Sequence, residues 1–315
     1  MEDATVDMSI QQLRMLREVA IRGTIVAAAS SLGYTPSAVS QQLGGLERST
    51  GVAVLERVGR NVRLTDAGRE LVRHAGDLLA SLEAARAAME QVAGEVRGTV
   101  ELSVYESVAV TLLVPLLEQL GDQHPELQVR TRQLDVEPAL EAVAAGTVDV
   151  AFTLDYAHAP MSQPAGVSST SLLDDVFHLV VPSGDAVGVT TASLIDFADR
   201  PFIASSTATS CGSSVVVACR SAGFEPDIAH QIDDFPTMMR LVAAGAGVAL
   251  VPDLGLLGLP AGVRVVDIDR PFSRTIQIAY RTASAARPAV AAVHDALVAV
   301  VDRLAPSPGQ VAATA

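Results

Sequence analysis

The sequence predicts an α/β protein in which one long helix joins a small, mostly helical N-terminal module to a larger body of two α/β lobes. Three observations support this prediction: short amphipathic helices before residue 64, a heptad repeat over about 65–93, and alternating strand-like and helix-like segments from residue 98. The 315 residues suffice for two or three domains with a substantial core.

Charge is distributed unevenly along the chain. Residues 14–73 hold nine arginines and five acidic residues, whereas residues 98–315 hold 11 arginines and 24 acidic residues. A basic module followed by an acidic body is typical of a polyanion-binding module joined to a larger globular part.

The stretch TPSAVSQQLGGLER at residues 35–48 is predicted to form a helix with one apolar and one small polar face. Thr35 can cap the helix, and Pro36 suits its first position. The apolar stripe consists of Val39, Leu43 and Leu46, and the polar face of Ser37, Ser40, Gln41 and Gly44. Such a face can approach base edges in a major groove, although an ordinary surface helix has the same pattern.

The neighbouring segments favour the nucleic-acid interpretation. Two helices, at about 10–21 and from Thr24 to residue 32, precede this helix and end at Gly23 and Gly33, which predicts a helix-turn-helix. Residues 52–64 then resemble a hairpin that carries Arg57, Arg60 and Arg63. Surface arginines can simply aid solubility, but beside a helix-turn-helix they suit phosphates or a minor groove. Residues 1–64 are therefore predicted to be a winged helix-turn-helix DNA-binding domain.

A long helix is predicted after Thr65, within a linker and hinge at residues 65–97. Its apolar residues fall at alternating steps of four and three: Leu71, Ala75, Leu78, Leu82, Ala85, Met89 and Val92. A heptad seam of this length needs a partner surface. A symmetric dimer would supply it and would place two recognition helices on two half-sites, and the alternative is packing on the chain's own body.

Strands and helices alternate over residues 98–305, which predicts a clamshell with a cleft between two α/β lobes. The sequence predicts a loop at 160–169 and a helix near 191–198. The expected division is lobe I at 98–165 plus 269–305, lobe II at 166–268, and a disordered tail at 306–315.

The sequence predicts a cytoplasmic protein with no membrane span. The first ten residues carry three acids and no apolar run, and the apolar window 241–263 contains five glycines and two prolines. Two cysteines, Cys211 and Cys219, do not make a disulfide framework. On an intact helix they would be about 12 Å apart, too far for a disulfide. Redox sensing by these thiols is a minor alternative to burial as small apolar side chains.

Residues 9–70 resemble the N-terminal domain of LysR-type transcriptional regulators, in the stretches GTIVAAASSLGYTPSAVSQQLGGLE and TGVAVLERVGRNVRLTDAGREL. The segment AAGAGVALVP at 243–252 fits the body of the same family. The resemblance implies a winged helix-turn-helix, a dimerising linker helix and an effector domain similar to periplasmic binding proteins. It also implies a homodimer or a homotetramer built as a dimer of dimers, a double-stranded DNA operator, a small-molecule effector and RNA polymerase as a further partner.

The resemblance places the contacts to bases and phosphates on Thr24, Thr35, Pro36, Ser37, Ser40, Gln41 and Arg60. Many members of the family have Gln at the position of Pro36 and Arg at that of Gln41. Gln41 would favour adenine, whereas Arg would favour guanine. Gly44 and Gly45 lie where helix formers are expected, at a cost of about 1 kcal/mol each.

The resemblance also implies that an effector binds between the lobes, at strand ends and helix starts. The corresponding positions are Glu106, Ser107, Thr153, Asp155, Ser205, Ser206, Thr207, Thr209, Phe235 and Met238. Helix starts favour an anion, but few arginines lie near these positions, and Glu106 and Asp155 would suit an amine. The hydroxyl cluster at 205–210 could instead be a polar turn with capping residues.

The sequence contains no pattern for catalysis. The six histidines lack metal-ligand spacing, and there is no nucleophile elbow, P-loop or dinucleotide fingerprint. We therefore expect no enzyme, no catalytic or metal-binding residue and no cofactor apart from an unidentified effector. The alternatives are a solute-binding or enzymatic clamshell, which the N-terminal domain disfavours, and an architectural DNA binder that needs no effector.

Overall fold

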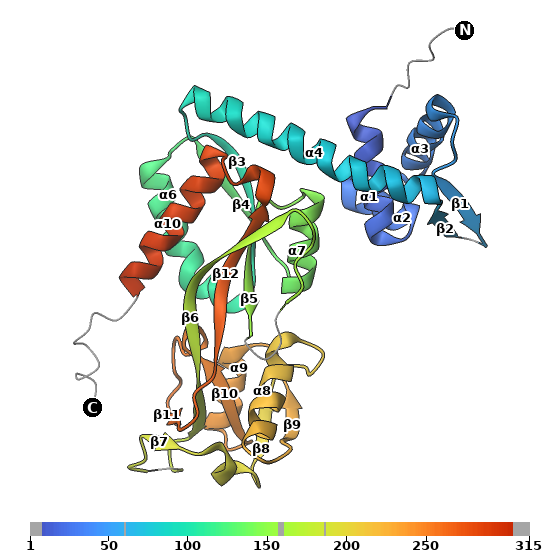
Figure 1. Cartoon of the computed structure of the whole chain (residues 1–315). Helices are drawn as coiled ribbons and strands as arrows, with labels where there is room; N and C mark the ends of the chain where they lie inside the picture. Colours follow the sequence, from blue (N-terminus) through green and yellow to red (C-terminus); the bar gives the residue numbers. More distant parts are fainter. Residues whose placement is uncertain (1–7, 60, 157–160, 186, 305–315) are drawn as a thin grey trace, which may run out of the picture.

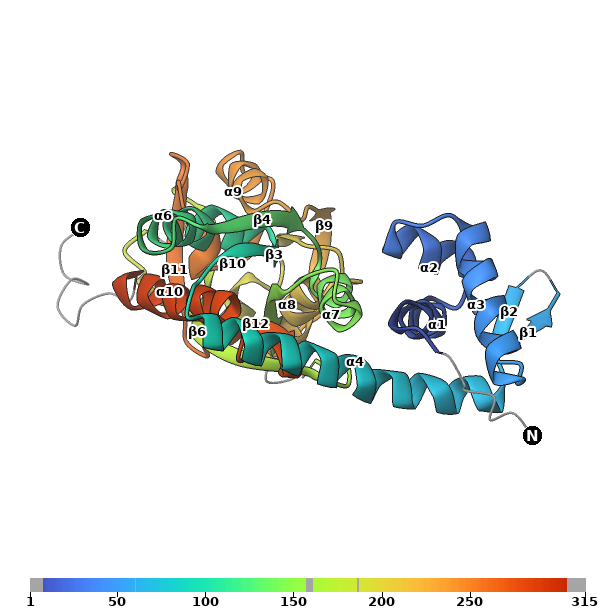
Figure 2. The same cartoon turned by 90° about the horizontal axis from the view of Figure 1, so that it is seen from above.

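The computed structural model describes residues 8–59, 61–156, 161–185 and 187–304. The N-terminal domain lies at one end of the long helix α4, lobe I lies against the other end, and lobe II lies beyond lobe I (Figures 1 and 2). The predicted fold class is confirmed by this arrangement. In the described part of the chain, no helix is long and apolar enough to cross a membrane.

The N-terminal domain is a helix-turn-helix with a two-stranded wing. Its elements are α1 (Ile10–Arg22), α2 (Ile25–Leu32), α3 (Pro36–Thr50), β1 (Leu55–Val58) and β2 (Asn61–Leu64). Ser9 and Gln12 form a reciprocal cap at the start of α1, and Thr24 and Thr35 cap the next two helices. The predicted apolar stripe of α3 is buried in this domain's core, together with residues of α1, α2 and the wing: Met15, Leu16, Val19, Ala28, Ala29 and Val54.

Helix α4 (Asp66–Ala93) continues directly from the wing. The Thr65 side chain accepts a hydrogen bond from the Gly68 N–H, and Gly94, with a φ of 69°, ends the helix. The first half of α4 packs on α1, and its second half packs on a short turn, Thr282–Ser284, of lobe I. The linker thus contacts both parts that it joins.

Lobe I is a sheet covered by helices on both faces. Its strands are β3 (Gly98–Val104), β4 (Leu127–Gln133), β5 (Val150–Asp155) and β12 (Ser273–Arg281), in the order β4-β3-β5-β12. Its helices are α5 (Glu106–Val108), α6 (Val114–Gln123), α7 (Val136–Ala145) and α10 (Pro288–Leu304). A π-helical segment, Ala109–Leu113, joins α5 to α6, and the proline at position 115 lacks the N–H that a regular helix would need there.

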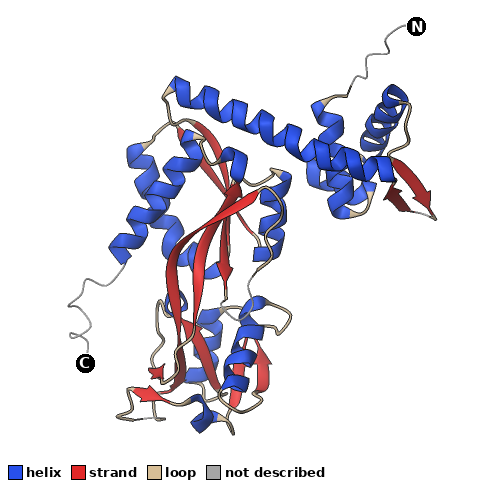
Figure 3. Ribbon diagram, in the orientation of Figure 1, coloured by secondary structure: helices blue, strands red, loops and turns tan. Residues whose placement is uncertain are grey.

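Lobe II continues the same sheet through β6 (Val167–Pro182). Its other strands are β7 (Thr191–Ala192), β8 (Pro201–Ala204), β9 (Asp227–Gln231), β10 (Val248–Pro252) and β11 (Val263–Ile268), and its helices are α8 (Ser210–Ser221) and α9 (Phe235–Ala243). The strands β6 and β12 pair antiparallel and run from one lobe toward the other (Figure 3). The two lobes therefore share one ten-stranded sheet.

The structure differs from the sequence expectations in three places of the body. The segment 160–169 is not wholly a loop, because β6 begins at Val167 and pairs with Arg281. Its polar start lacks an apolar alternation and is held by the ladder to β12. The lobe boundary expected at 165/166 lies at the beginning of this strand, which crosses between the lobes near Val176.

The prediction of a helix near 191–198 is also wrong. The segment forms β7 and one 3₁₀ turn, Leu194–Phe197. Only Leu194 and Phe197 of the turn are buried, three residues apart, which matches a single 3₁₀ turn. The tail at 306–315 lies outside the described residues.

Candidate DNA-binding and effector sites

The exposed face of α3 carries the predicted base-reading residues. Ser37, Ser40 and Gln41 are exposed, while Val39 and Leu43 on the other side of the helix are buried. Within the described chain, Ser40 and Gln41 have no side-chain hydrogen bond. The two side chains are therefore free to meet another molecule.

Two predicted contact residues also act as helix caps. The hydroxyl of Thr24 accepts a hydrogen bond from the Ala27 N–H, and that of Thr35 accepts one from the Ala38 N–H. A capping hydroxyl still has its own proton to donate. The caps thus place two hydroxyl groups at helix starts, where a phosphate is favoured.

The wing separates the arginines that the sequence grouped together. Arg57 pairs in register with Val62, whereas Arg63 pairs in register with Glu56, so Arg57 and Arg63 lie on opposite faces of the hairpin. Arg63 also forms an ion pair with Glu56 at 2.7 Å. Arg57 is exposed. Arg60 lies outside the described residues.

The predicted seam of α4 is exposed along its second half. Leu78 is 48% exposed, Met89 74% and Val92 90%, and Ala85 is also exposed. Leu71 and Leu82 are half-buried, and Ala75 is buried on the side of α1. A seam of apolar side chains facing water is typical of a helix that needs a partner.

A different face of α4 holds lobe I. Glu83 lies 3.2 Å from Arg281, and Glu90 lies 3.1 Å from Arg287. Asp149, at the start of β5, pairs with both arginines at 3.1 and 2.9 Å. These five residues, which we call the linker clasp, join α4 to lobe I without using the apolar seam.

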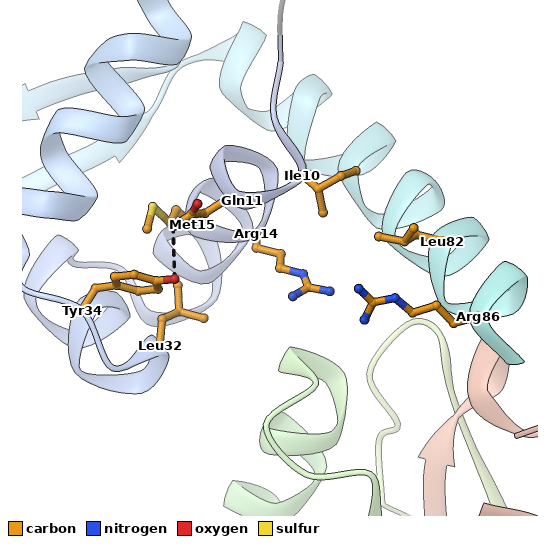
Figure 4. A pocket seen from close by; sticks show the side chains of 8 residues that line it. All are labelled: Ile10, Gln11, Arg14, Met15, Leu32, Tyr34, Leu82 and Arg86. Atoms are coloured by element: carbon orange, nitrogen blue, oxygen red, sulfur yellow. Dashed lines mark hydrogen bonds between the residues drawn. The ribbon is translucent and has the colours of Figure 1, made fainter. Parts of the chain in front are cut away.

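A crevice of about 510 Å³ lies between α1 and α4. The guanidinium groups of Arg14 and Arg86 point toward one another across it, and Gln11 donates a hydrogen bond to the Tyr34 hydroxyl at 3.1 Å (Figure 4). Leu82 of the seam forms part of the same wall. The crevice therefore opens beside the exposed seam.

A buried ion pair lies where the two lobes meet. Arg274 of β12 is 2% exposed and binds Asp175 of β6, which is fully buried, at 2.8 Å. Arg274 also donates to the Ser107 hydroxyl of α5 at 2.8 Å, and the Leu254 N–H of lobe II donates to Asp175 at 2.9 Å. Burial raises the pKa of Asp175, against the opposing effect of Arg274. The pair thus links β6 and β12, which carry it, to groups of both lobes.

Two carboxyl groups meet where lobe I faces lobe II. Glu106 of lobe I hydrogen-bonds Asp234, the N-cap of α9 in lobe II. Burial and the hydrogen bond to Asp234 raise the pKa of Glu106 to about 7. Hydrogen bonds from Thr237 lower the pKa of Asp234. The pKa values of the two carboxyl groups are therefore shifted in opposite directions.

The hydroxyl cluster at 205–210 forms a capped turn at the start of α8. Thr209 caps the helix by accepting from the Gly212 N–H, and the Ser206 N–H donates to Asp233. A Cβ at Gly212 would lie 2.4 Å from the carbonyl oxygen of Ser205, so the turn packs directly on the helix start. Ser205 is buried and Thr207 is exposed. This turn matches the structural alternative considered for the cluster.

The other predicted effector residues differ in their burial and in their contacts. Thr153 is buried at the end of β5, and Asp155 accepts a hydrogen bond from the Met161 N–H. Phe235 and Met238 pack in the core of lobe II, at 6% and 1% exposure, and their expected role in effector binding stays a prediction. They lie three residues apart on the apolar face of α9, which faces the sheet.

Several residues that the sequence reasoning missed gather around the ion pair. The Arg274 guanidinium lies 5.8 Å from the ring centres of Tyr105 and Phe177. The sequence pattern of β12 could have predicted this ion pair. Arg274 shares the inward face of the strand with Ile276 and Ile278, and a charge on a buried face needs a partner.

The two cysteines differ in their surroundings. Cys219 is fully buried in α8, and burial raises the pKa of its thiol to about 12. Cys211, at the second position of α8, is half-buried. Among the described residues, both cysteines are free thiols.

Comparison with known proteins identifies the family. Residues 10–69 match "Bacterial regulatory helix-turn-helix protein, lysR family", and residues 93–302 match "LysR substrate binding domain". The chain belongs to the LysR-type transcriptional regulators. Its DNA-binding domain and its effector domain thus correspond to the two parts that the geometry distinguishes.

This LysR-type regulator is similar to characterised members over most of its length. It is 27% identical to the transcriptional dual regulator GltC of Bacillus subtilis, over 78% of this chain and 81% of GltC. It is 28% identical to a probable hydrogen peroxide-inducible genes activator of Mycobacterium avium, over 80% of each chain. The structure of full-length CbnR with its target DNA has the same fold, with a TM-score of 0.53 and 22% identity over 93% of this chain and all of that one.

Proposed function

We propose that this regulator binds a specific DNA operator through the polar face of α3 and that a small molecule bound between its lobes controls it. The observation that carries the proposal is the exposed pair Ser40 and Gln41, unpartnered on a helix whose opposite face is anchored in the core. That combination suits a helix inserted in a major groove.

The neighbouring residues have complementary roles in the proposal. Thr24 and Thr35 would bind phosphates from their helix starts, and Pro36 and Ser37 would lie next to the groove. Gln41 would bond an adenine through two hydrogen bonds. Arg57 and Arg60 of the wing would contact phosphates, while Arg63 is already held by Glu56. The relative CbnR has been captured on its target DNA, which supports this role for the domain.

We further propose that two copies associate through the seam of α4. The exposed side chains of Leu78, Met89 and Val92 favour a second copy over packing on lobe I, because lobe I is already held by the linker clasp on another face. The family resemblance extends this proposal to a dimer of dimers and to contact with RNA polymerase. Such a regulator would work in the cytoplasm, where bacterial DNA is found.

The effector would bind beside the buried ion pair. In the described chain, the buried hydroxyls of Tyr105 and Thr153 have no hydrogen-bond partner. They lie at the carboxyl ends of the parallel strands β3 and β5, where ligands bind in sheets of this kind. A ligand there would have to separate Glu106 from Asp234.

A small-molecule effector is better supported than thiol oxidation. The Mycobacterium avium relative is named as peroxide-inducible. In this chain, however, Cys219 is fully buried and its raised pKa keeps it a thiol, so the second sulfur of a disulfide would be unreactive unless α8 unfolded.

Operator selection from genomic fragments, followed by footprinting with and without candidate metabolites, tests the DNA-binding proposal. Ser40→Ala should weaken operator binding about tenfold, because it removes one base or phosphate contact. Ser30→Ala is the matched control, since Ser30 is exposed on α2 away from this face.

Arg60→Ala or Arg57→Ala should reduce the salt dependence of operator binding by about one unit of slope if each contacts a phosphate. No preference for any duplex would overturn the proposal.

Calorimetric titration of the full chain with a metabolite panel tests the effector. Saturable binding without turnover, weakened in Tyr105→Phe, which removes only the unpartnered hydroxyl, supports a sensor. Turnover would favour an enzymatic clamshell. Operator binding that no metabolite alters would favour the effector-independent architectural protein.

A further inference from the structure

Helix α7 of lobe I contacts a different part of the chain at each of its ends. At its start, the Glu137 carboxylate accepts a hydrogen bond at 3.3 Å from the hydroxyl of Ser210, the first residue of α8 in lobe II. At its end, the Ala144 carbonyl accepts a hydrogen bond from the Arg17 guanidinium of α1. One helix of ten residues thus contacts both lobe II and the DNA-binding domain, and it lies between α8 and α1 (Figure 2).

The end of α7 is shaped to receive guanidinium groups. The last carbonyls of a helix lack helical partners and carry partial negative charge. Arg281 donates to Val143 at 3.2 Å and to Val148 at 2.8 Å beside the site of Arg17. Gly146 has a φ of 79°, and a Cβ there would meet the Arg281 guanidinium at 3.6 Å. The positive φ favours glycine at this position, and Arg281 packs against it at an ordinary contact distance.

Arg17 differs from the other arginines of α1. Arg22 forms an ion pair with Glu18 at 2.6 Å, and Arg14 is exposed beside the crevice with Arg86. Arg17 is half-buried and reaches lobe I. Burial lowers its pKa, which Glu18 opposes, and the nearby charge of Arg281 lowers it further. Arg17 and Arg281 donate to neighbouring carbonyls, those of Ala144 and Val143, which explains why two cations lie side by side at this helix end.

We propose that α7 docks the DNA-binding domain on lobe I through Arg17 and relays the state of the interlobe cleft to it through Glu137. The relay rests on the proposed function, because the effector is what would move Ser210 relative to Glu137. Glu137 and Ala144 lie on one continuous α-helix. A displacement of its first turn therefore shifts the carbonyls that hold Arg17, and the orientation of the DNA-binding domain follows.

Hydrogen–deuterium exchange of the full-length protein, without DNA or effector, tests the docking contact. Arg17→Gln removes the charged donor and should speed exchange about tenfold in the last turns of α1 and α7. Arg14→Gln is the matched control, one turn earlier on the same helix, and should leave both turns unchanged. Equal exchange in the two variants would overturn the docking contact.

The relay has its own pair of variants in the same experiment. Glu137→Ala should speed exchange about threefold in residues 13–22 of α1, although position 137 lies at the far end of α7. Ser210→Ala removes the same bond from lobe II and should reproduce this change. Glu141→Ala is the control, because Glu141 is exposed on α7 away from both ends.

An effect of Glu137→Ala confined to α7 and α8 would overturn the relay. DNA and effector are absent from these measurements, so their result does not depend on finding an operator. Failure of operator selection, by contrast, would overturn the proposed function and leave the docking contact standing.

Discussion

At the scale of single residues, the buried pair of Arg274 and Asp175 organises the centre of the body. Its two charges are removed from water, and each is satisfied by the other and by groups of both lobes: Ser107 from lobe I and the Leu254 N–H from lobe II. Removing one partner leaves an uncompensated charge, whereas removing both leaves an apolar gap. The two changes have different energetic consequences.

Asp175→Asn should therefore lower the free energy of unfolding by about 3–5 kcal/mol, because Arg274 stays buried without its counter-charge. Asp175→Leu combined with Arg274→Met should recover most of this loss. Urea denaturation measures both variants. Asp174→Asn is the control, since Asp174 bonds Thr275 at an exposed position. A double variant as unstable as the single one would contradict this account.

The carboxyl pair at the cleft predicts a pH dependence. The pKa of Glu106 is about 7 in the folded protein, above the usual value of 4.5. The folded state thus binds the proton more tightly, and this contribution to stability is complete below pH 4.5 and is lost as the pH rises through about 7. Glu106→Gln keeps a hydrogen-bond donor without a proton to lose. Thermal unfolding between pH 5 and 8 should show a smaller decrease for this variant than for the unmodified chain, and identical slopes would rule out Glu106 as the source.

At the scale of elements, α4 uses its faces for different partners. Glu83 and Glu90 project toward lobe I, while Leu78, Met89 and Val92 remain in water. Because lobe I holds α4 on one face, α4 can present its apolar seam to a second copy without breaking its contacts with lobe I. The seam and the clasp can therefore be disturbed independently.

Leu78→Asp or Leu82→Asp should dissociate the dimer, because each places a charge in an apolar seam. Sedimentation velocity gives the oligomeric state. Ala84→Asp, at an exposed position of the same helix off the seam, should leave the oligomer intact. An unchanged oligomer in all three variants would remove the argument for the seam.

At the scale of the whole molecule, the linker clasp decides how the parts move together. Arg281 is the last residue of β12, and Arg274 is its second, so the same strand meets the interlobe ion pair at one end and the clasp at the other. Because Asp149 holds both clasp arginines, α4 and lobe I are expected to move as one body.

Glu83→Ala should loosen α4 from lobe I, because it removes the carboxylate that faces Arg281. Trypsin should then cut several-fold faster after Arg97, which is exposed between α4 and β3. Glu70→Ala is the control, because Glu70 pairs with Arg73 on the exposed first half of α4. An equal cutting rate in the two variants would show that the clasp does not hold the linker.

The sequence by itself determined the elements whose pattern is local. The cap at Thr35, the helix starts at Thr24 and Thr65, the buried stripe of α3 and the heptad seam of α4 all lie where predicted. Helix periodicity and capping depend on neighbours within a few residues, so they can be predicted from the amino-acid sequence alone. The exposed residues of α3 followed from the same periodicity.

Only the tertiary structure decided which distant residues meet. Asp175 and Arg274 are 99 positions apart, and Arg17 lies 127 positions before Ala144, yet each pair is in direct contact. The same folding packed Phe235 and Met238 in the core of lobe II. Contacts of this kind depend on how β6 and β12 cross between the lobes, and side-chain periodicity along a single segment contains no information about that crossing.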